Sequence, residues 1–197
     1  MTPLKTVAFL ARWPGFLVLE GLMKDPRIDL VAVYTHGALP RAEGGGARPE
    51  TYHFQAALRE KLHIRETSPE DFERVDLILS LSWRRKIPVE GKFKVAAINI
   101  HRGELLRYAG AGPVKRAITT RASRLAITAH HMTDEIDGGD PIAVVYSNVP
   151  EAPYGMNLDE HAELAKEYLY PLYWPLVDLA ITTVARPRIR FGQDGRR

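Results

Sequence analysis

Short apolar runs alternate with amphipathic stretches along the first half of the chain. The runs at 4–11 and 28–35 are rich in β-branched and aromatic residues, and the stretch between them repeats its apolar positions at helical spacing. This pattern predicts a β-α-β unit. The runs at 75–82 and 95–100 are apolar almost without interruption, which is typical of strands buried on both faces of a parallel sheet.

The second half of the chain predicts a hairpin and a long helix. The runs at 124–132 and 141–149 flank an acidic loop and could pair as an antiparallel hairpin at the edge of the sheet. The stretch 158–184 has the pattern of one long helix, but it contains Pro171 and Pro175. Because proline lacks a backbone N–H and clashes with the preceding turn, we expect this helix to be kinked or split.

The remaining segments predict connections and the extent of the domain. The stretch 40–50 holds two prolines and three consecutive glycines, which predicts a loop that leads to a helix over about 50–62. Pro113 stands where the first turn of a further helix would lie. With 197 residues and 45% hydrophobic content, we expect one catalytic domain over 1–185, followed by a basic tail over 186–197.

The alternating units predict the α/β class, with an open, mostly parallel, twisted sheet of Rossmann-like form. We expect helices on both faces of this sheet and the antiparallel hairpin at one edge. In such sheets ligands bind beyond the carboxyl ends of the strands. Asn99, His101 and the acidic loop 133–140 follow predicted strands, so we expect them at that edge.

The composition excludes several classes of protein. The net charge is only +3, and no stripe of Lys and Arg interleaved with aromatic residues marks a regular element, so we expect no nucleic-acid partner. The chain has no cysteine, which excludes disulfides, thiolate metal sites and cysteine nucleophiles. The first apolar run is too short for a signal peptide and no long apolar stretch follows, so we expect a cytoplasmic protein with no membrane partner.

The first candidate for chemistry is the pair Asn99 and His101. Residues two apart in an extended stretch point to the same side, so the two side chains can face one small volume. A side-chain amide beside an imidazole suits a site where a carbonyl becomes an oxyanion, because the amide stabilises the developing charge and the histidine moves a proton. The alternative is a structural role, in which the asparagine caps a turn and the histidine makes its hydrogen bonds near the core.

The second candidate is the stretch HHMTDEIDGGD, residues 130–140. Adjacent histidines on a strand point to opposite faces, so His130 and His131 cannot both serve one site. The carboxylates that follow do not have the spacing of an EF-hand loop, and we expect no metal. Two glycines follow Asp137 and can tighten the backbone so that its carboxylate is held in place. The alternative is a solvated acidic turn.

Together, the stretches INIHRGELLRYAGAGPVKRAI (98–118) and ITAHHMTDEIDGGDPI (127–142) resemble the formyltransferase family that uses 10-formyltetrahydrofolate. The family pattern is roughly N-[LIV]-H-x-S-L-L-P-x-[YW]-x-G, followed downstream by H-x(6)-D-x-G. The resemblance covers about 4–184 and is strongest between 80 and 150. It implies 10-formyltetrahydrofolate as the co-substrate. The matching positions are Asn99, His101, His130 and Asp137.

The resemblance also implies a role for each matching residue. An acceptor amine attacks the formyl carbon, and Asn99 and His101 stabilise the oxyanion that forms. Asp137 positions His101 or a water that relays the amine proton to the leaving folate nitrogen. The folate is expected against the segment 79–88 and the backbone around 136–140. The residues implied in folate binding are Ser82, Trp83, Arg84, Ile87, Ile136, Gly138 and Asp140.

The residues that depart from the family pattern lie where the family binds its acceptor. Arg102, Gly103 and Glu104 stand in a loop that lines the acceptor side in the family, and they differ from its common residues. The resemblance implies a small-molecule amine, either an amino-sugar nucleotide or an amine derived from an amino acid. Glycinamide ribonucleotide transformylases carry a glycine-rich phosphate loop that the stretch 11–16 lacks. Methionyl-tRNA formyltransferases carry a further C-terminal domain.

Two alternatives stay open at this point. A 10-formyltetrahydrofolate hydrolase has a similar second motif, and water would then replace the amine. A catalytically silent folate-binding protein would keep the same fold, although the intact Asn99, His101 and Asp137 argue against it. The apolar stretch 168–181 could be core or the surface of a homodimer.

Overall fold

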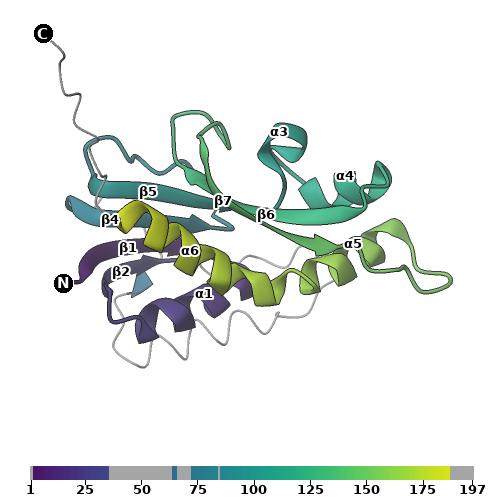
Figure 1. Ribbon diagram of the computed structural model, residues 1–197, viewed down its shortest axis with the longest axis horizontal. Coiled ribbons are helices and arrows are strands. Elements are labelled where there is room, and N and C mark those ends of the chain that lie inside the picture. The colour runs from purple at the N-terminus through teal and green to yellow at the C-terminus, as the bar shows by residue number, and fades with distance from the viewer. Residues whose placement is uncertain (1, 36–63, 66–71, 84, 187–197) are drawn as a thin grey trace, which may run out of the picture.

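The computed structural model describes residues 2–35, 64–65, 72–83 and 85–186 (Figure 1). The predicted loop at 40–50, the predicted helix at 50–62, Arg84 and the tail beyond Arg186 lie outside these residues. The described strands form one seven-stranded sheet in the order β3-β2-β1-β4-β5-β6-β7. They are β1 (Leu4–Leu10), β2 (Ile28–Tyr34), β3 (Ile64–Arg65), β4 (Val75–Leu81), β5 (Phe93–His101), β6 (Arg124–His131) and β7 (Pro141–Asn148).

The pairing of the strands confirms the predicted fold class. The five strands from β3 to β5 pair in parallel. β6 then runs antiparallel to both β5 and β7, which makes β6 and β7 the expected hairpin at the edge of the sheet. The long connections that parallel pairing requires carry the helices, whereas the hairpin needs only the acidic loop between its strands.

Among the described residues, the two longest helices pack over one face of the sheet. α1 and α6 lie side by side against it (Figure 1). The segment α4 begins at Pro113, as its position in the sequence predicts. Within the described residues, no helix has the length and apolar character needed to cross a bilayer. The helical segments are α1 (Arg12–Lys24), α3 (Leu105–Tyr108), α4 (Pro113–Thr119), α5 (Leu158–Glu167), the 3₁₀ turn η2 (Tyr170–Leu172) and α6 (Tyr173–Ala185).

Alternation along the strands separates two apolar clusters, one on each face of the sheet. On β5, Ala96, Ile98 and Ile100 join the cluster that α1 and α6 cover. Ala97 belongs to the cluster on the opposite face. Because successive side chains of a strand point to opposite faces, Asn99 and His101 lie on the face away from α1 and α6.

The C-terminal helix is split once. α5 starts with a capping box on Asn157 and ends at Glu167, and Pro171 then lies in the 3₁₀ turn η2. The predicted split is therefore confirmed, and Pro175 stands in the first turn of α6, where a missing N–H leaves no helical bond unmade. Most apolar side chains of the stretch 168–181 are core rather than surface. The buried ones are Leu169, Tyr173, Leu176, Val177, Ala180 and Ile181.

Candidate active site

The candidate site is built on the antiparallel pair of β5 and β6. In the register of the two strands, Asn99 lies opposite His130 and His101 lies opposite Thr128. Cross-strand partners share a face of the sheet, so all four polar side chains project to the side away from α1 and α6. His131 is exposed on the other side, as the alternation of the two histidines predicts.

Asp137 reaches this cluster from the loop between β6 and β7. Its Oδ2 lies 3.0 Å from Nδ1 of His101 and accepts the backbone N–H of Gly110 at 2.8 Å. Its Oδ1 accepts an N–H of the Asn99 amide at 3.3 Å. Only 8% of each of the His101 and Asp137 side chains is exposed. The three residues that the sequence motifs select, at 99, 101 and 137, therefore meet in one buried cluster.

The ionisation of Asp137 follows from its surroundings. Burial on its own would raise the pKa of this carboxyl. The hydrogen bonds from the His101 side chain and from the backbone N–H of Gly110 outweigh burial and hold the pKa well below its usual range. The carboxylate is therefore charged at neutral pH and lies beside the imidazole of His101.

The hydrogen bonds of His101 indicate that its ring is protonated on both nitrogens. Nδ1 faces the Asp137 carboxylate, and Nε2 lies 2.8 Å from the carbonyl oxygen of Tyr108. Both neighbours only accept hydrogen bonds, so each ring nitrogen must donate. The cation is compensated by the carboxylate, and the carbonyl fixes the orientation of the ring.

The orientation of the Asn99 amide follows in the same way. Nδ1 of His130 lies 2.9 Å from the carbonyl oxygen of His131 and must donate to it, which leaves Nε2 as an acceptor. The Asn99 Nδ2 lies 3.0 Å from that Nε2 and also donates to Asp137. Both N–H groups of the amide are thus engaged by the protein. The oxygen of the Asn99 amide remains available to a ligand.

Glycines make the cluster possible at two places. Asp137 has a positive φ of 55°, and a Cβ on Gly139 would lie 1.8 Å from the carbonyl oxygen of His131, so the loop closes only without a side chain there. A Cβ on Gly103 would lie 2.9 Å from Nε2 of His101. The glycines after Asp137 were identified from the sequence. The contact of Gly103 was not, because it depends on the path of the chain after β5.

The residues expected to bind folate lie on two neighbouring segments. Ser82 follows β4 with a φ of 58°, and the Trp83 ring packs edge-on against Phe9 at 5.3 Å between centroids. On the loop after β6, Ile136 is 87% exposed, and a salt bridge of 2.9 Å from Lys86 to Asp134 joins the two segments.

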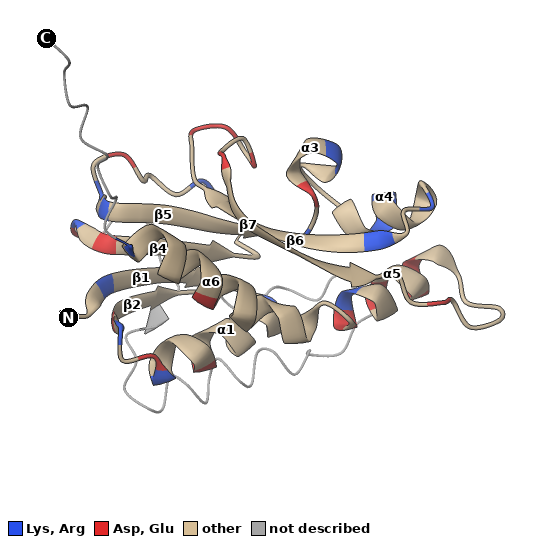
Figure 2. Cartoon of the chain, in the orientation of Figure 1, with Lys and Arg blue, Asp and Glu red and all other residues tan. Residues whose placement is uncertain are grey.

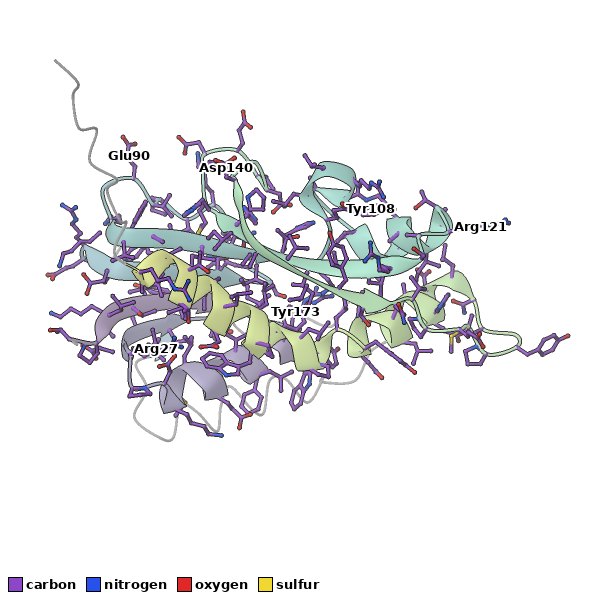
Figure 3. The ribbon with its side chains drawn as sticks, in the orientation of Figure 1. Arg27, Glu90, Tyr108, Arg121, Asp140 and Tyr173 are labelled. Atoms are coloured by element: carbon purple, nitrogen blue, oxygen red, sulfur yellow. The ribbon has the colours of Figure 1, made fainter. Side chains whose placement is uncertain are left out.

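The other expected folate residues differ in exposure. Gly138 and Asp140 lie in the same loop as Asp137, and Asp140 is exposed where the loop enters β7 (Figure 3). Ile87 is buried in the apolar cluster on the site's face of the sheet, so its side chain contributes to the core.

The side chain of Arg102 points to the opposite face of the sheet from that of His101. Its Nε donates to the buried hydroxyl of Tyr173 on α6, at 2.7 Å. Figure 3 shows Tyr173 on the helix α6 and Tyr108 among the segments above the sheet. Arg102 therefore ties the start of the loop after β5 to the helix on the opposite face, a contact that the sequence alone did not indicate.

Two hollows accompany this arrangement. The larger, about 750 Å³, is an open groove between α1 and the segment η2–α6, on the face away from Asn99. The smaller, about 180 Å³, lies beside α3, between α4 and β6. Among the described residues, no group of three His, Asp or Glu side chains is arranged to hold a metal ion.

Comparison with known proteins identifies the family. Residues 47–165 match the family model described as formyl transferase. The chain belongs to the formyl transferase family. The matched segment contains β4, β5, β6 and the loop of Asp137, so the site residues at 99, 101 and 137 all lie within it.

Curated relatives and solved structures agree with this assignment. The chain is 35% identical over 69 residues to the methionyl-tRNA formyltransferase of Latilactobacillus sakei, which is 34% of this chain and 22% of the relative. It is 27% identical over 169 residues to that of Lactobacillus delbrueckii, which is 79% of this chain and 52% of the relative. The chain thus spans about half the length of these curated relatives or less.

The solved structures share the fold at low identity. Glycinamide ribonucleotide transformylase 1 of Geobacillus kaustophilus superposes with a TM-score of 0.64 and 17% identity, over 92% of this chain and 97% of that one. The sugar 3N-formyl transferase WlaRD, in the presence of dTDP and 5-N-formyl-THF, gives a TM-score of 0.67 and 16% identity. It is covered over 64% of its length, and this chain over 92%.

Proposed function

We propose that the protein transfers a formyl group from 10-formyltetrahydrofolate to the amine of a small metabolite. The observation that carries the proposal is the cluster of Asn99, His101 and Asp137 at the end of β5, in which a charged carboxylate contacts both the imidazole of His101 and the amide of Asn99. The chain's membership of the formyl transferase family supports the same reaction.

The residues have distinct parts in the proposed reaction. The amine nitrogen forms a bond to the formyl carbon, the bond from that carbon to N10 of the folate breaks, and the amine proton passes to N10. His101 is the cation that stabilises the oxyanion, and Asp137 keeps it protonated and oriented. Asp137 also positions a water that relays the proton.

A hydrogen bond of His101 must be exchanged before this residue can stabilise the oxyanion. The Nε2–H of His101 donates to the Tyr108 carbonyl, and the amide N–H groups of Asn99 donate to His130 and Asp137. For these donors to reach a ligand, His101 must leave the carbonyl of Tyr108. The free oxygen of the Asn99 amide can accept an N–H of the incoming amine, which would orient the nitrogen lone pair toward the formyl carbon.

The donor is proposed to bind between the segment after β4 and the loop of Asp137. These segments are joined by the pair of Lys86 and Asp134, and the exposed Ile136 offers apolar surface for a pteridine ring. Calorimetry with a stable folate analogue tests this part. Binding in the micromolar range is expected, and no heat together with no thermal stabilisation would overturn it.

The acceptor is the subject of the main experiment. Purified protein is incubated with 10-formyltetrahydrofolate and a panel of amines, which includes amino-sugar nucleotides, amino-acid-derived amines and methionyl-tRNA, while the folate product is followed by absorbance. The expected result is turnover that depends on one small-molecule amine. Formate release at full rate without any amine would show a hydrolase instead, and donor binding without turnover on the whole panel would show a silent protein.

A further inference from the structure

The strand β7 forms one edge of the sheet. It follows β6 in the strand order, and no described strand lies beyond it. Its sequence, PIAVVYSN, holds no charged residue, and none of its eight residues is buried, whereas six of the eight residues of β6 are. An uncharged apolar strand at the edge of a sheet is a template for a further strand, because one row of its N–H and C=O groups has no neighbouring strand to bond.

The hydrogen bonds to β6 determine which backbone groups of β7 point outward. The N–H of Val149 donates to the carbonyl of Ser123, and these two residues continue the register of the β6–β7 ladder as a bonded pair. Bonded and non-bonded pairs alternate along an antiparallel ladder, so every second residue of β7, counted back from Val149, bonds to β6. The residues between them direct their N–H and C=O groups away from β6. These residues are Val144, Tyr146 and Asn148.

The outward groups form a short row that we call the open edge, residues 144–148. Within the described part of the chain, no backbone group bonds to this row, and the one side chain that does is Ser147, whose hydroxyl donates to the carbonyl of Asn148 at 3.3 Å. The row ends toward the start of β7, where the register shifts and Pro141 has no N–H to offer. A partner strand can therefore add only along 144–148.

We propose that the open edge pairs with the open edge of a second copy of this chain, antiparallel and about a twofold axis. In such a pair the residue on the axis lies opposite itself. An axis at Tyr146 sets Val144 opposite Asn148 of the second copy, so that all the outward N–H and C=O groups of both copies form hydrogen bonds. An axis at Val144 or Val145 would set Asn148 against the irregular start of the strand. The axis therefore lies at Tyr146.

The side chains along the open edge suit pairing with an identical strand. Tyr146 is 43% exposed, and the guanidinium of Arg124 lies over its ring at 4.6 Å from the centroid. At the axis two such rings would lie opposite each other, and aromatic cross-strand pairs stabilise a sheet. On the face toward α6, Val145 would lie opposite Ser147 of the second copy. Because the strand has no charged side chain, self-pairing sets no like charges opposite each other.

The charges at the two ends of the hairpin favour a second copy in this direction. Figure 2 shows acidic positions in the loop between β6 and β7 and basic positions at the beginning of β6. Glu135 and Asp140 are exposed at the acidic end, and Arg121 and Arg124 are exposed at the other end, beside Glu151.

Antiparallel pairing brings the acidic end of each copy to the basic end of the other. It keeps like ends roughly 26 Å apart, which is eight residues at about 3.3 Å each and well beyond the Debye length of about 8–10 Å. A parallel pair would place like ends together. The axis is perpendicular to the sheet, so the sheet continues through both copies and both candidate sites open on the same face.

The first test measures the mass of the full chain in solution. Sedimentation equilibrium is recorded from about 1 to 100 µM, a range that detects micromolar association. Wild type should be a dimer at the upper end. Tyr146→Lys should raise the dissociation constant at least about 10-fold, because it puts two like charges at the axis. The matched control is Tyr154→Lys, at a fully exposed tyrosine outside the strand, which should stay within about twofold of wild type. A monomer at every concentration, or equal effects of the two variants, would overturn the proposal.

A second variant acts on the backbone and keeps the hairpin intact. Asn148→Pro removes an N–H that points away from β6, so the bonds between β6 and β7 remain. Circular dichroism and urea unfolding should match wild type, while the dissociation constant of the dimer rises about as much as in Tyr146→Lys. This variant decides the question if Tyr146→Lys does not fold. A folded Asn148→Pro that dimerises as tightly as wild type would refute pairing through the open edge.

The last test uses the absence of cysteine from the chain. A single cysteine at position 146 would lie about 5.5 Å from its copy, measured between Cα atoms of a bonded cross-strand pair, and disulfides form at about 4.4–6.8 Å. Under mild oxidation Tyr146→Cys should become mainly a disulfide-linked dimer, and the control Tyr154→Cys should link far more slowly although its position is more exposed. Equal rates would show random collision and contradict the proposal. A monomer that instead binds an added extended peptide along 144–148 would also refute it.

Discussion

Replacement of Asp137 by asparagine tests the centre of the site most sharply. The change keeps the shape of the side chain and removes its charge. In wild type, Oδ2 accepts from both His101 and Gly110, and Oδ1 accepts from Asn99. The single oxygen of the new amide can serve only one of these two sides, and its NH₂ group must face a donor on the other.

The best orientation of the new amide keeps its oxygen toward His101 and Gly110. Its NH₂ group then confronts the Nδ2 of Asn99, which in wild type is 3.3 Å from the replaced oxygen. If the Asn99 amide rotates so that its oxygen and NH₂ group exchange places, its oxygen meets the lone pair of His130 Nε2. One buried hydrogen bond is therefore lost in either arrangement, at a cost of about 1–3 kcal/mol. That is a part of the roughly 5–15 kcal/mol that stabilises a domain, so the variant should still fold.

The catalytic cost should be much larger than the structural one. Without the carboxylate, the cluster has no negative charge to stabilise the imidazolium or to position the relay water. We expect turnover of the accepted amine to fall by about 10²–10⁴-fold, the usual contribution of positioned proton transfer. The assay is kcat/KM by folate absorbance, with urea unfolding of the same preparation as the measure of folding.

The acidic loop supplies matched controls for this variant. Asp134 is 87% exposed and pairs with Lys86 at the surface, and Glu135 lies beside it. Asp134→Asn and Glu135→Gln remove the same charge from the same loop, and turnover should stay within about threefold of wild type, because exposed ion pairs contribute little. The reasoning is refuted if folded Asp137→Asn turns over as fast as these controls.

Three further predictions follow from individual contacts. Gly103→Ala should lower kcat by about tenfold and displace the imidazole signals in NMR spectra, because its Cβ would lie 2.9 Å from Nε2 of His101; an unchanged kcat would contradict this. Gly139→Ala should lower the free energy of unfolding by about 1–3 kcal/mol or more, since the loop must open to relieve a contact of 1.8 Å with His131, and urea titration measures this. The folded pKa of Asp137 is depressed, so its contribution to stability is complete above the unfolded value of about 3.9 and is lost as pH falls toward the folded value. Between pH 5 and pH 2.5, wild type should therefore lose more stability than Asp137→Asn, and equal losses would argue against the ion pair.

Local patterns in the sequence predicted the features of the fold that depend only on residues close together in the chain. Period-two alternation predicts that Asn99 and His101 share a side, and that His130 and His131 do not. The apolar runs predicted the central strands and the edge hairpin. Pro171 split the terminal helix because the loss of an N–H there acts within one turn, whatever the rest of the chain does.

The tertiary structure decided everything that depends on how distant segments align. The antiparallel register sets Asn99 opposite His130, which then fixes the orientation of the amide. The carbonyl of Tyr108 and the N–H of Gly110 complete the site through the backbone, whose groups are identical in every residue and leave no mark in the sequence.

Arg102 shows the same limit. It is 71 positions from Tyr173 in the sequence, and its side chain reaches the Tyr173 hydroxyl on the opposite face of the sheet. The chemistry of the side chains and the local spacing of apolar and polar positions can be read from the sequence. The register of strand pairs, the path of loops and the direction of a long side chain are set by the packing of the whole domain. Only that packing determines which groups that are distant in the sequence come into contact and shield one another from water.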